Sequence, residues 1–427
     1  MHKLLSRQNK TTDINSFYRV LGRFASSQMI ATVLRLISGL LVVRLIEPEL
    51  YGQFTGVGVY LGFLLIGQGG IINGLSRELP YELGRGNIEF GTEMTSSVFV
   101  FTTIISLLAS LVFLFFGIKE LFFSNYTLGL IYMSYVLIAA LHLLNVQFLP
   151  TLYRTNNDFD TLSRQKIYVG VCNLLSVILI WFYSIYGLLI RAILLATIEF
   201  FLLYKKRPIF FYFKYNFYHI RHLFKTGIPI YMVGMINLLW NTIVKSLIFN
   251  IGGAISYGFF ALSLIVENVF GIIPISLAKV IYPKMAIMLG QGEPISKIIK
   301  FSIKPLFFQF LLMLFLALIG VYLLPIIVPM ILPNYIDGIL AAQWMLFIPV
   351  AQSFTSLNSI YNVLKKQKWY LISLLSGAFI GSLFMVIKLN YGGFRLEIFP
   401  QGLVIGTIIQ QMLSILFIYR KILNDER

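Results

Sequence analysis

Long apolar runs recur along this chain, and they constrain its fold more than any other feature. Twelve runs, each near the about 20 residues that a helix needs to cross the roughly 30 Å hydrocarbon core of a bilayer, are separated by short polar loops. We therefore predict an all-α, polytopic membrane protein with twelve transmembrane helices, over residues 18–46, 52–77, 93–117, 126–152, 163–184, 187–205, 222–250, 257–283, 297–324, 335–364, 368–388 and 400–423.

The charged residues are few, and their distribution predicts the orientation. Only 12% of the 427 residues are charged, against about 25% in soluble proteins. If both termini are cytoplasmic, 25 of the 34 Lys and Arg residues lie on the inner side and 4 on the outer side, as the positive-inside rule requires. The net charge of +17 is spread over inner loops, where it would meet anionic lipid headgroups, so we expect no nucleic-acid partner.

The chain contains an internal repeat. "YGQF" at Tyr51 returns as "YGFF" at Tyr257, 206 residues later, and "LGRGN" returns as "LGQGE" at the same spacing. Tyr153 and Tyr361 agree with that spacing within two residues. Because each copy holds six spans, an even number, both copies begin on the same side of the membrane and are parallel repeats.

The repeat predicts the domain organisation. We expect an N-terminal six-helix bundle over residues 1–205 and a C-terminal six-helix bundle over residues 227–427, around a central cavity. Residues 206–226 join the bundles and mix aromatic with cationic side chains, "KRPIFFYFKYNFYHIRHLFK". This mixture is typical of a segment that lies on a membrane interface.

Polar side chains within the spans indicate a binding surface. Gln28 lies about 20° from Arg35 around the first helix, and Asn237, Asn241 and Lys245 follow at spacings of four in the seventh span. The 206-residue spacing places Asn241 on the position of Arg35, so the same face is polar in both copies. A charge inside the hydrocarbon costs about 2.5 to 3.5 kcal/mol and normally faces a cavity or a partner. We predict that these five residues bind substrate.

Two titratable residues are candidates for ion coupling. Glu267 in the eighth span either neutralises Lys245 or Arg35, or takes up a proton during transport. His142 in the fourth span is either a proton-binding residue or a hydrogen-bonded core histidine, and a lone histidine cannot build a metal site.

Several other polar residues fit a structural role. We expect Glu199, which follows Arg191 and precedes Lys205, to form an ion pair near the interface. Five amides in the second half can hydrogen-bond either between helices or to a sugar: Gln343, Gln352, Asn358, Gln410 and Gln411.

Catalytic motifs are missing from the sequence. There is no glycine-rich phosphate loop followed by lysine, no Cys/His metal spacing and no GxSxG. We therefore expect no enzyme activity, no catalytic residues, no bound metal and no cofactor.

Two stretches resemble one protein family. The first span with its continuation, "VLRLISGLLVVRLIEPELYGQF", and the stretch that ends the second span, "GGIINGLSRELPYELGRGN", are similar to bacterial polysaccharide-repeat flippases, the O-antigen flippase family. That family belongs to the multidrug/oligosaccharidyl-lipid/polysaccharide exporter superfamily. The resemblance covers nearly the whole chain and implies two six-helix halves around a V-shaped cavity, in the bacterial cytoplasmic (inner) membrane.

The resemblance also implies a function. Such a protein translocates undecaprenyl-diphosphate-linked oligosaccharide units from the cytoplasmic to the periplasmic leaflet by alternating access, for O-antigen, lipopolysaccharide or similar polysaccharide biosynthesis. Family cavities are cationic, and Arg35 and Lys245 would supply the cations here, whereas Glu267 departs from that pattern. The expected partners are the lipid-linked oligosaccharide, membrane lipids and a downstream polysaccharide polymerase.

Two other functions are compatible with the same spans. A multidrug antiporter of the same superfamily would export organic cations, and it should carry acidic groups in its first helix, where this chain has arginine. A membrane glycan polymerase would need larger outer loops than the longest one here, residues 388–399.

Overall fold

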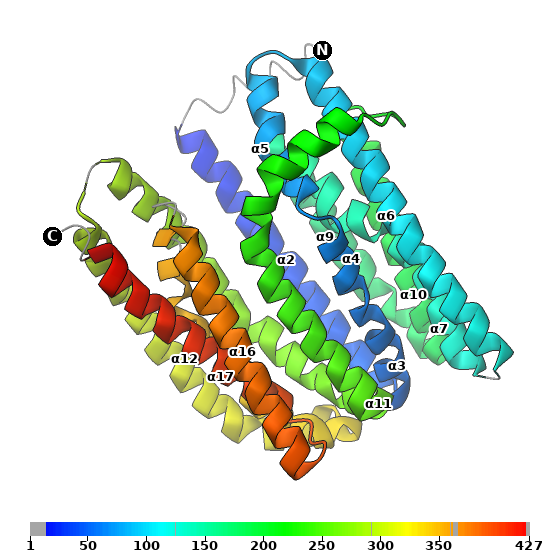
Figure 1. Cartoon of the computed structure of the whole chain (residues 1–427). Coiled ribbons are helices and arrows are strands. Elements are labelled where there is room, and N and C mark those ends of the chain that lie inside the picture. The colour runs from blue at the N-terminus through cyan, green and yellow to red at the C-terminus, as the bar shows by residue number, and fades with distance from the viewer. Residues whose placement is uncertain (1–13, 124, 292, 359, 362–365, 424–427) are drawn as a thin grey trace. The chain divides into compact units, whose positions relative to one another are not determined.

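The computed structural model describes residues 14–423 except 124, 292, 359 and 362–365, and this part of the chain consists of helices joined by short loops, without strands (Figure 1). The first copy contains α2 (Ile14–Leu45), α3 (Pro48–Val59), α4 (Leu61–Gly67), α5 (Ile71–Gly84), α6 (Ile88–Phe122), α7 (Tyr126–Leu143), η2 (Leu144–Phe148), α8 (Leu149–Thr155), α9 (Phe159–Leu175) and α10 (Val177–Lys205). The second contains α11 (Phe217–Gly290), α12 (Ile295–Ile331), η3 (Pro333–Gly338), α13 (Ile339–Met345), α14 (Phe347–Ala351), η4 (Gln352–Asn358), α16 (Gln367–Gly392), α17 (Ile398–Phe417) and η5 (Ile418–Leu423). The prediction of an all-α membrane protein is confirmed.

Ten helical stretches among the described residues are long and apolar enough to cross a membrane. The difference from the twelve predicted spans comes from sharp reversals. Ser184 has φ 48° inside α10, and a Cβ atom on Gly187 would lie 2.0 Å from the carbonyl oxygen of Leu179. Residues eight apart in a straight helix are about 12 Å apart along its axis, so the chain turns back on itself here.

α11 reverses in the same way. Gly253 has φ 74°, a conformation that only glycine adopts readily, and the rings of Phe249 and Tyr257 lie 5.8 Å apart across it. α11 therefore consists of a first limb before Gly253 and a second limb after it. With α10 and α11 each divided at its reversal, every predicted span has a helical counterpart.

The helices pack into two units, each described by itself. Unit 1 takes Met1–Ile46 and Gln53–Leu239, and unit 2 takes Glu47–Gly52 and Trp240–Arg427. Within α11 the division falls between Leu239 and Trp240, and α11 begins at Phe217, inside the segment predicted as a linker. Domain boundaries at residues 205 and 226 therefore stay a prediction.

In unit 1 an apolar core lies beneath the linker. Leu75, Met94, Phe148 and Leu152 are buried in it, and the linker contributes Phe211. These side chains come from α5, α6, η2, α8 and the linker, so the core joins all five segments. The start of α11 adds Ile220 and Leu223 to the same core.

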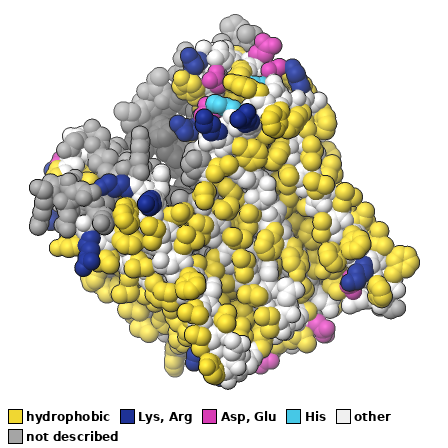
Figure 2. Space-filling model, viewed as in Figure 1, with side chains coloured by type: hydrophobic (Ala, Val, Ile, Leu, Met, Phe, Trp, Pro, Cys, Tyr) yellow, Lys and Arg dark blue, Asp and Glu magenta, His cyan; other side chains and the backbone are white. Residues whose placement is uncertain are grey.

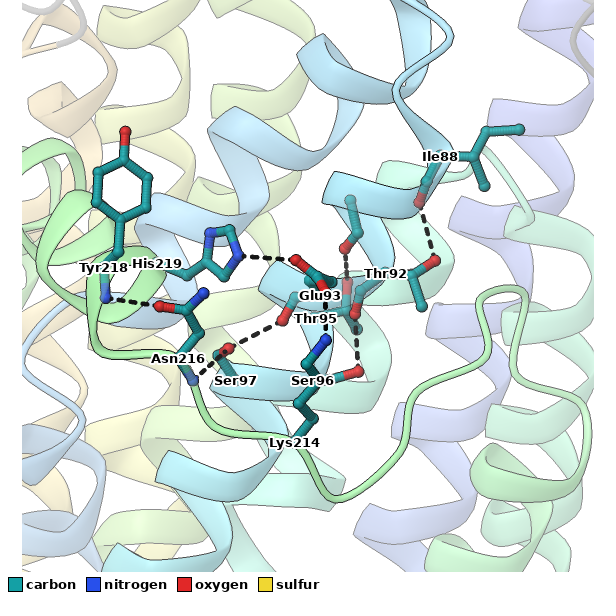
Figure 3. A network of polar contacts seen from close by, with 11 residues as sticks. Ile88, Thr92, Glu93, Thr95, Ser96, Ser97, Lys214, Asn216, Tyr218 and His219 are labelled. Atoms are coloured by element: carbon teal, nitrogen blue, oxygen red, sulfur yellow. Dashed lines mark hydrogen bonds and ion pairs between the residues drawn. The ribbon is translucent and has the colours of Figure 1, made fainter.

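Polar contacts fasten the linker to α6 (Figure 3). Glu93 accepts from Lys214 at 2.5 Å and lies 3.4 Å from Nε2 of the buried His219. Ser96 and Ser97, in the next turn of α6, accept hydrogen bonds from main-chain N–H groups of the linker. The linker is thus an ordered part of unit 1.

In unit 2, α16 and α17 approach closely through glycines. A Cβ atom on Gly381 would lie 2.5 Å from the carbonyl oxygen of Gly402, and one on Gly377 would lie 2.4 Å from that of Gly406. The indole of Trp240 packs against Gly381 and Gly406 and donates to Ser382 at 3.1 Å. Small residues allow such close helix packing in membrane proteins.

Large hydrophobic side chains cover much of the surface. In the space-filling view hydrophobic side chains cover most of the face shown, with few charged side chains among them (Figure 2). Exposed examples are Trp181, Phe182, Phe308 and Tyr322, each at least 70% accessible. This surface is typical of helices surrounded by lipid.

Two contacts repeat between the copies. The hydroxyl of Tyr153 donates to the carbonyl of Leu203 at 2.7 Å, and that of Tyr361 donates to the carbonyl of Ser414 at 2.6 Å. Both acceptors lie in the last long helix of their copy, α10 or α17. This is the correspondence that two parallel repeats predict.

The second repeated contact is reciprocal and lies within unit 2. A Cβ atom on Gly52 would meet the carbonyl oxygen of Ala254 at 1.8 Å, and one on Gly258 would meet that of Pro48 at 1.8 Å. Gly52 and Gly258 are the glycines of the two repeated motifs, and Pro48 and Ala254 are separated by the same 206 residues. The two helices therefore meet at equivalent positions.

Candidate functional site

The predicted binding residues of the first span lie on α2. Arg35 is exposed, and its Nε donates to the carbonyl of Ala31 one turn earlier at 3.2 Å. Within the part of the chain that the structure describes, Arg35 forms no ion pair with a carboxylate. Gln28 is partly exposed on the same helix. The cationic group of Arg35 is therefore accessible and not neutralised by a described acid.

The predicted residues of the seventh span lie on the first limb of α11. Asn237, Asn241 and Lys245 are all partly exposed. Arg35 belongs to unit 1 and Lys245 to unit 2. Their joint participation in one central cavity stays a prediction.

Glu267 and His142 were the candidates for ion coupling. Glu267 is partly exposed on the second limb of α11, and among the described residues it forms no ion pair with Lys245. The alternative in which Glu267 neutralises Lys245 is therefore not seen. His142 is partly exposed and lies two residues before η2. Their coupling role stays a prediction.

A polar cavity lies within unit 1, at a place that the sequence analysis did not single out. It has a volume of about 650 Å³ and lies between α5 on one side and η2 with α8 on the other. Seven polar residues line it, and the lining contains no Asp or Glu among the residues described: Asn73, Ser76, Gln147, Thr151, Arg154, Thr155 and Asn157.

The end of α8 positions Arg154, which is the one cation in the described lining of this cavity. Asn157 has φ 55° and its N–H donates to the carbonyl of Arg154, while the N–H of Asp158 donates to that of Tyr153. This is the Schellman arrangement that ends a helix, and asparagine tolerates its left-handed position. Asp158 then caps α9 through Thr161. Arg154 is thereby fixed in the last turn, where the helix dipole favours a cation.

A π-helical turn precedes Arg154. η2 spans Leu144–Phe148 and brings Val146 and Gln147 to the cavity wall. Such one-residue expansions of a helix are frequent at functional sites. No sequence signal predicts the π turn, and the 206-residue repeat pointed only to Tyr153, the residue before Arg154.

Another arginine, Arg191, joins three helices of unit 1. Arg191 of α10 donates from Nη2 to Oγ of Ser38 in α2 at 2.8 Å and to Oδ1 of Asn173 in α9 at 2.5 Å. Ser38 also donates to the main-chain carbonyl of Asn173 at 2.8 Å. This contact holds α2, the helix of Arg35, against its neighbours.

Four of the remaining polar candidates form contacts between helices: Glu199, Gln343, Asn358 and Gln411. Glu199 pairs with Lys166 of α9 at 2.8 Å, so an ion pair forms with a partner other than Arg191 or Lys205. Of the five amides, Gln343 donates to the carbonyl of Val321. Asn358 and Gln411 hydrogen-bond to each other and to Ser414 and Thr355, which joins η4 to α17.

Comparison with known proteins supports the fold. The sequence matches no protein-family model and no curated protein sequence. Among solved structures it is similar to the inward-facing conformation of a multidrug resistance MATE family transporter of the MOP superfamily, with a TM-score of 0.72 and 16% identity over 95% of this chain and 99% of that one. The outward-facing conformation of such a transporter matches with a TM-score of 0.59 and 15% identity, over 95% of this chain and 96% of that one.

A third similar structure is a MOP superfamily transporter from Pyrococcus furiosus, with a TM-score of 0.61 and 14% identity over 96% of both chains. It is described as having a binding pocket of reverse polarity that suggests a different function. At these identities the similarity establishes the fold. The chain has the fold of MATE family transporters, whereas the resemblance to O-antigen flippases stays a prediction.

Proposed function

We propose that this chain is a transporter of the cytoplasmic membrane that works by alternating access, with both termini in the cytoplasm. The observation that carries the proposal is the match to transporter structures over 95% of the chain. The long apolar helices and the apolar surface support a membrane location. A ligand that contacts two conformations differently is what converts binding into transport.

Two substrate classes compete. The comparisons by themselves favour a multidrug antiporter, because the similar structures are described as multidrug transporters. The side chains favour an anionic substrate, because Arg35 and Arg154 are accessible cations without a described carboxylate partner. The Pyrococcus furiosus transporter, with its reversed pocket polarity, supports the idea that this fold accommodates both signs of charge.

From the positive charge of these accessible arginines we infer that the substrate is an oligosaccharide linked to a lipid through a diphosphate. Its phosphates would be attracted by Arg35 and Lys245, while Gln28, Asn237 and Asn241 would hydrogen-bond to sugars. Glu267 and His142 are the candidate proton-binding residues. No observation favours the glycan polymerase, since the similar structures are transporters.

Reconstitution into liposomes tests the proposal. Translocation of a fluorescent undecaprenyl-diphosphate oligosaccharide is measured beside efflux of ethidium, an organic cation. We expect oligosaccharide translocation, slowed about tenfold or more by Arg35→Gln or Lys245→Gln, the loss expected for a charge-assisted hydrogen bond. Arg44→Gln is the matched control, since Arg44 lies nine residues along α2 on the opposite face. Ethidium efflux without oligosaccharide translocation would establish the multidrug alternative.

A further inference from the structure

The cavity in unit 1 has a lining of unusual chemistry for a membrane protein. One cation, three amides and three hydroxyl-bearing side chains face it, and its described lining has no acid to neutralise the cation. The volume of about 650 Å³ is in the range of sites that hold small organic ligands. A permanent cation beside neutral hydrogen-bonding groups is suited to an anion that also carries hydroxyl groups.

Arg154 has donors to spare. Its Nε donates to the carbonyl of Pro150 at 3.3 Å and its Nη2 to Oγ1 of Thr151 at 3.1 Å, both on its own helix. A guanidinium has five N–H donors in a rigid fork, so these contacts orient the group and leave its other donors for a ligand. Arginine binds phosphate through two parallel hydrogen bonds of this kind.

The opposite wall supplies oriented neutral groups. Oδ1 of Asn73 accepts from the buried Gln68 at 3.3 Å, which directs the Asn73 amide. The hydroxyl of Ser76 donates to the carbonyl of Asn73 at 2.8 Å and keeps its oxygen able to accept. Gln147 faces them from the π turn. Amides and hydroxyls at fixed positions are what the hydroxyl groups of a sugar require.

We propose that this cavity binds a sugar phosphate, with Arg154 on the phosphate and Asn73 and Gln147 on sugar hydroxyls. An organic cation is disfavoured, because Arg154 would repel it. That the sugar phosphate is the head of a transported lipid rests on the proposed function, whereas binding itself does not require transport.

Binding of glucose 1-phosphate to the purified full-length chain in nanodiscs tests this. Isothermal titration should give saturable binding that Arg154→Gln weakens about tenfold or more, the loss expected for a charge-assisted hydrogen bond. Arg77→Gln is the matched control, because Arg77 lies on α5, outside the lining, with a 64% exposed side chain. Equal weakening by both substitutions, or none by Arg154→Gln, would overturn the assignment.

A second variant, Gln147→Leu, distinguishes binding of the sugar from binding of the phosphate. Because it should keep phosphate binding, it also shows whether a substituted cavity is still folded. It should weaken glucose 1-phosphate severalfold and leave inorganic phosphate unchanged, whereas Arg154→Gln should weaken both. Loss of phosphate binding in Gln147→Leu would contradict the assignment of the anion to Arg154. The proposal would also be overturned if the chain bound no glucose 1-phosphate but bound the organic cation tetraphenylphosphonium saturably, and if Arg154→Gln strengthened that binding.

Adding phosphatidylinositol to phosphatidylcholine nanodiscs identifies the source of the sugar phosphate. Competition with glucose 1-phosphate would assign the site to a lipid-linked head, and no competition would assign it to a soluble ester; both outcomes keep the cavity as a sugar phosphate site. The proposed function fails separately, if glucose 1-phosphate binds at Arg154 but liposomes translocate no lipid-linked oligosaccharide.

Discussion

The surroundings of Tyr153 in unit 1 and of Tyr361 in unit 2 differ although the two tyrosines make the same contact. Six residues before Tyr153, Gln147 lines an open cavity. Six residues before Tyr361, Thr355 accepts a hydrogen bond from Gln411 of α17 at 2.8 Å. Asn358 adds further hydrogen bonds between η4 and α17. Polar residues thus serve packing in one copy and leave a ligand-sized space in the other.

This difference shows how a duplicated fold can gain a site. The tyrosine contact fixes the helix positions in both copies, and the choice of neighbouring side chains decides whether polar groups satisfy one another or face open space. Among the described residues of unit 2, Asn358, Gln411, Thr355 and Ser414 pair with one another. Arg154, which has no carboxylate partner among the described residues, would gain from binding an anion.

The largest effect is expected where the copies are alike, at the reciprocal glycines. Gly52→Leu or Gly258→Leu would place a side chain on the main chain of the other helix, and overpacking costs about 1–3 kcal/mol or more. Titration with SDS in mixed micelles measures the free energy of unfolding. Gly271→Leu is the control on the same helix, since no atom lies within 4 Å of a Cβ there. A large loss of unfolding free energy for one glycine and none for the other would show that the two contacts are not equivalent.

The next test contrasts the copies. Asn358→Leu would leave the buried Gln411 with an unpaired side-chain oxygen and Ser414 with only its 3.4 Å contact to the hydroxyl of Tyr361, which costs about 1–3 kcal/mol. Gln147→Leu should change the free energy of unfolding by less than about 0.5 kcal/mol, because among the described residues Gln147 belongs to no buried hydrogen-bond network like that of Asn358. The same SDS titration compares them. Equal losses would show that Gln147 is a packing residue and not a ligand-binding one.

A smaller and equal effect is expected at the tyrosines. Tyr153→Phe and Tyr361→Phe each remove one hydroxyl that donates to a buried carbonyl, and we expect each to lower the free energy of unfolding by about 1 kcal/mol. Double substitution should be additive, because the two contacts belong to different units. Values that differ by more than a factor of three would show that the two contacts are not equivalent.

The smallest effect is expected at the linker, which has no counterpart in the second copy. Glu93→Gln should loosen the linker and speed its cleavage by trypsin at Lys214, with little effect on folding. The hydrogen bond that Lys214 donates to Glu93 raises the pKa of Lys214. The stabilisation of the linker by this ion pair is therefore present at neutral pH and is lost as pH rises through the raised pKa. Glu120→Gln, at the far end of the same helix, is the control. Unchanged cleavage in Glu93→Gln would show that the two serines hold the linker without the ion pair.

Much of the fold could be predicted from the sequence, because bilayer thickness imposes a length on each apolar run. The residue ranges were less predictable. The span over 335–364 consists of short 3₁₀ and α pieces in its described part, and the span over 52–77 is interrupted near Tyr60 and at Gly70, which has φ 89°. Such breaks depend on local packing, which hydropathy does not report.

The candidate site was only partly predictable. The helical spacing of Asn237, Asn241 and Lys245 identified a polar face, since spacing alone determines direction on a helix. The cavity could not be found this way, because Asn73 and Arg154 are far apart in sequence and meet only through packing of α5 against α8. In the sequence, nothing distinguishes Arg154 from the other arginines of the predicted loops.

The response of translocation to membrane potential tests the central claim most directly. Liposomes with a potassium gradient and valinomycin impose a potential that is negative on the side that carries the two termini, which the proposal places in the cytoplasm. Outward movement of a doubly charged, uncompensated anion then gains about 4.6 kcal/mol per 100 mV, so the translocation rate of the lipid-linked oligosaccharide should rise with the potential. No translocation at any potential, together with efflux of an organic cation, would contradict the account.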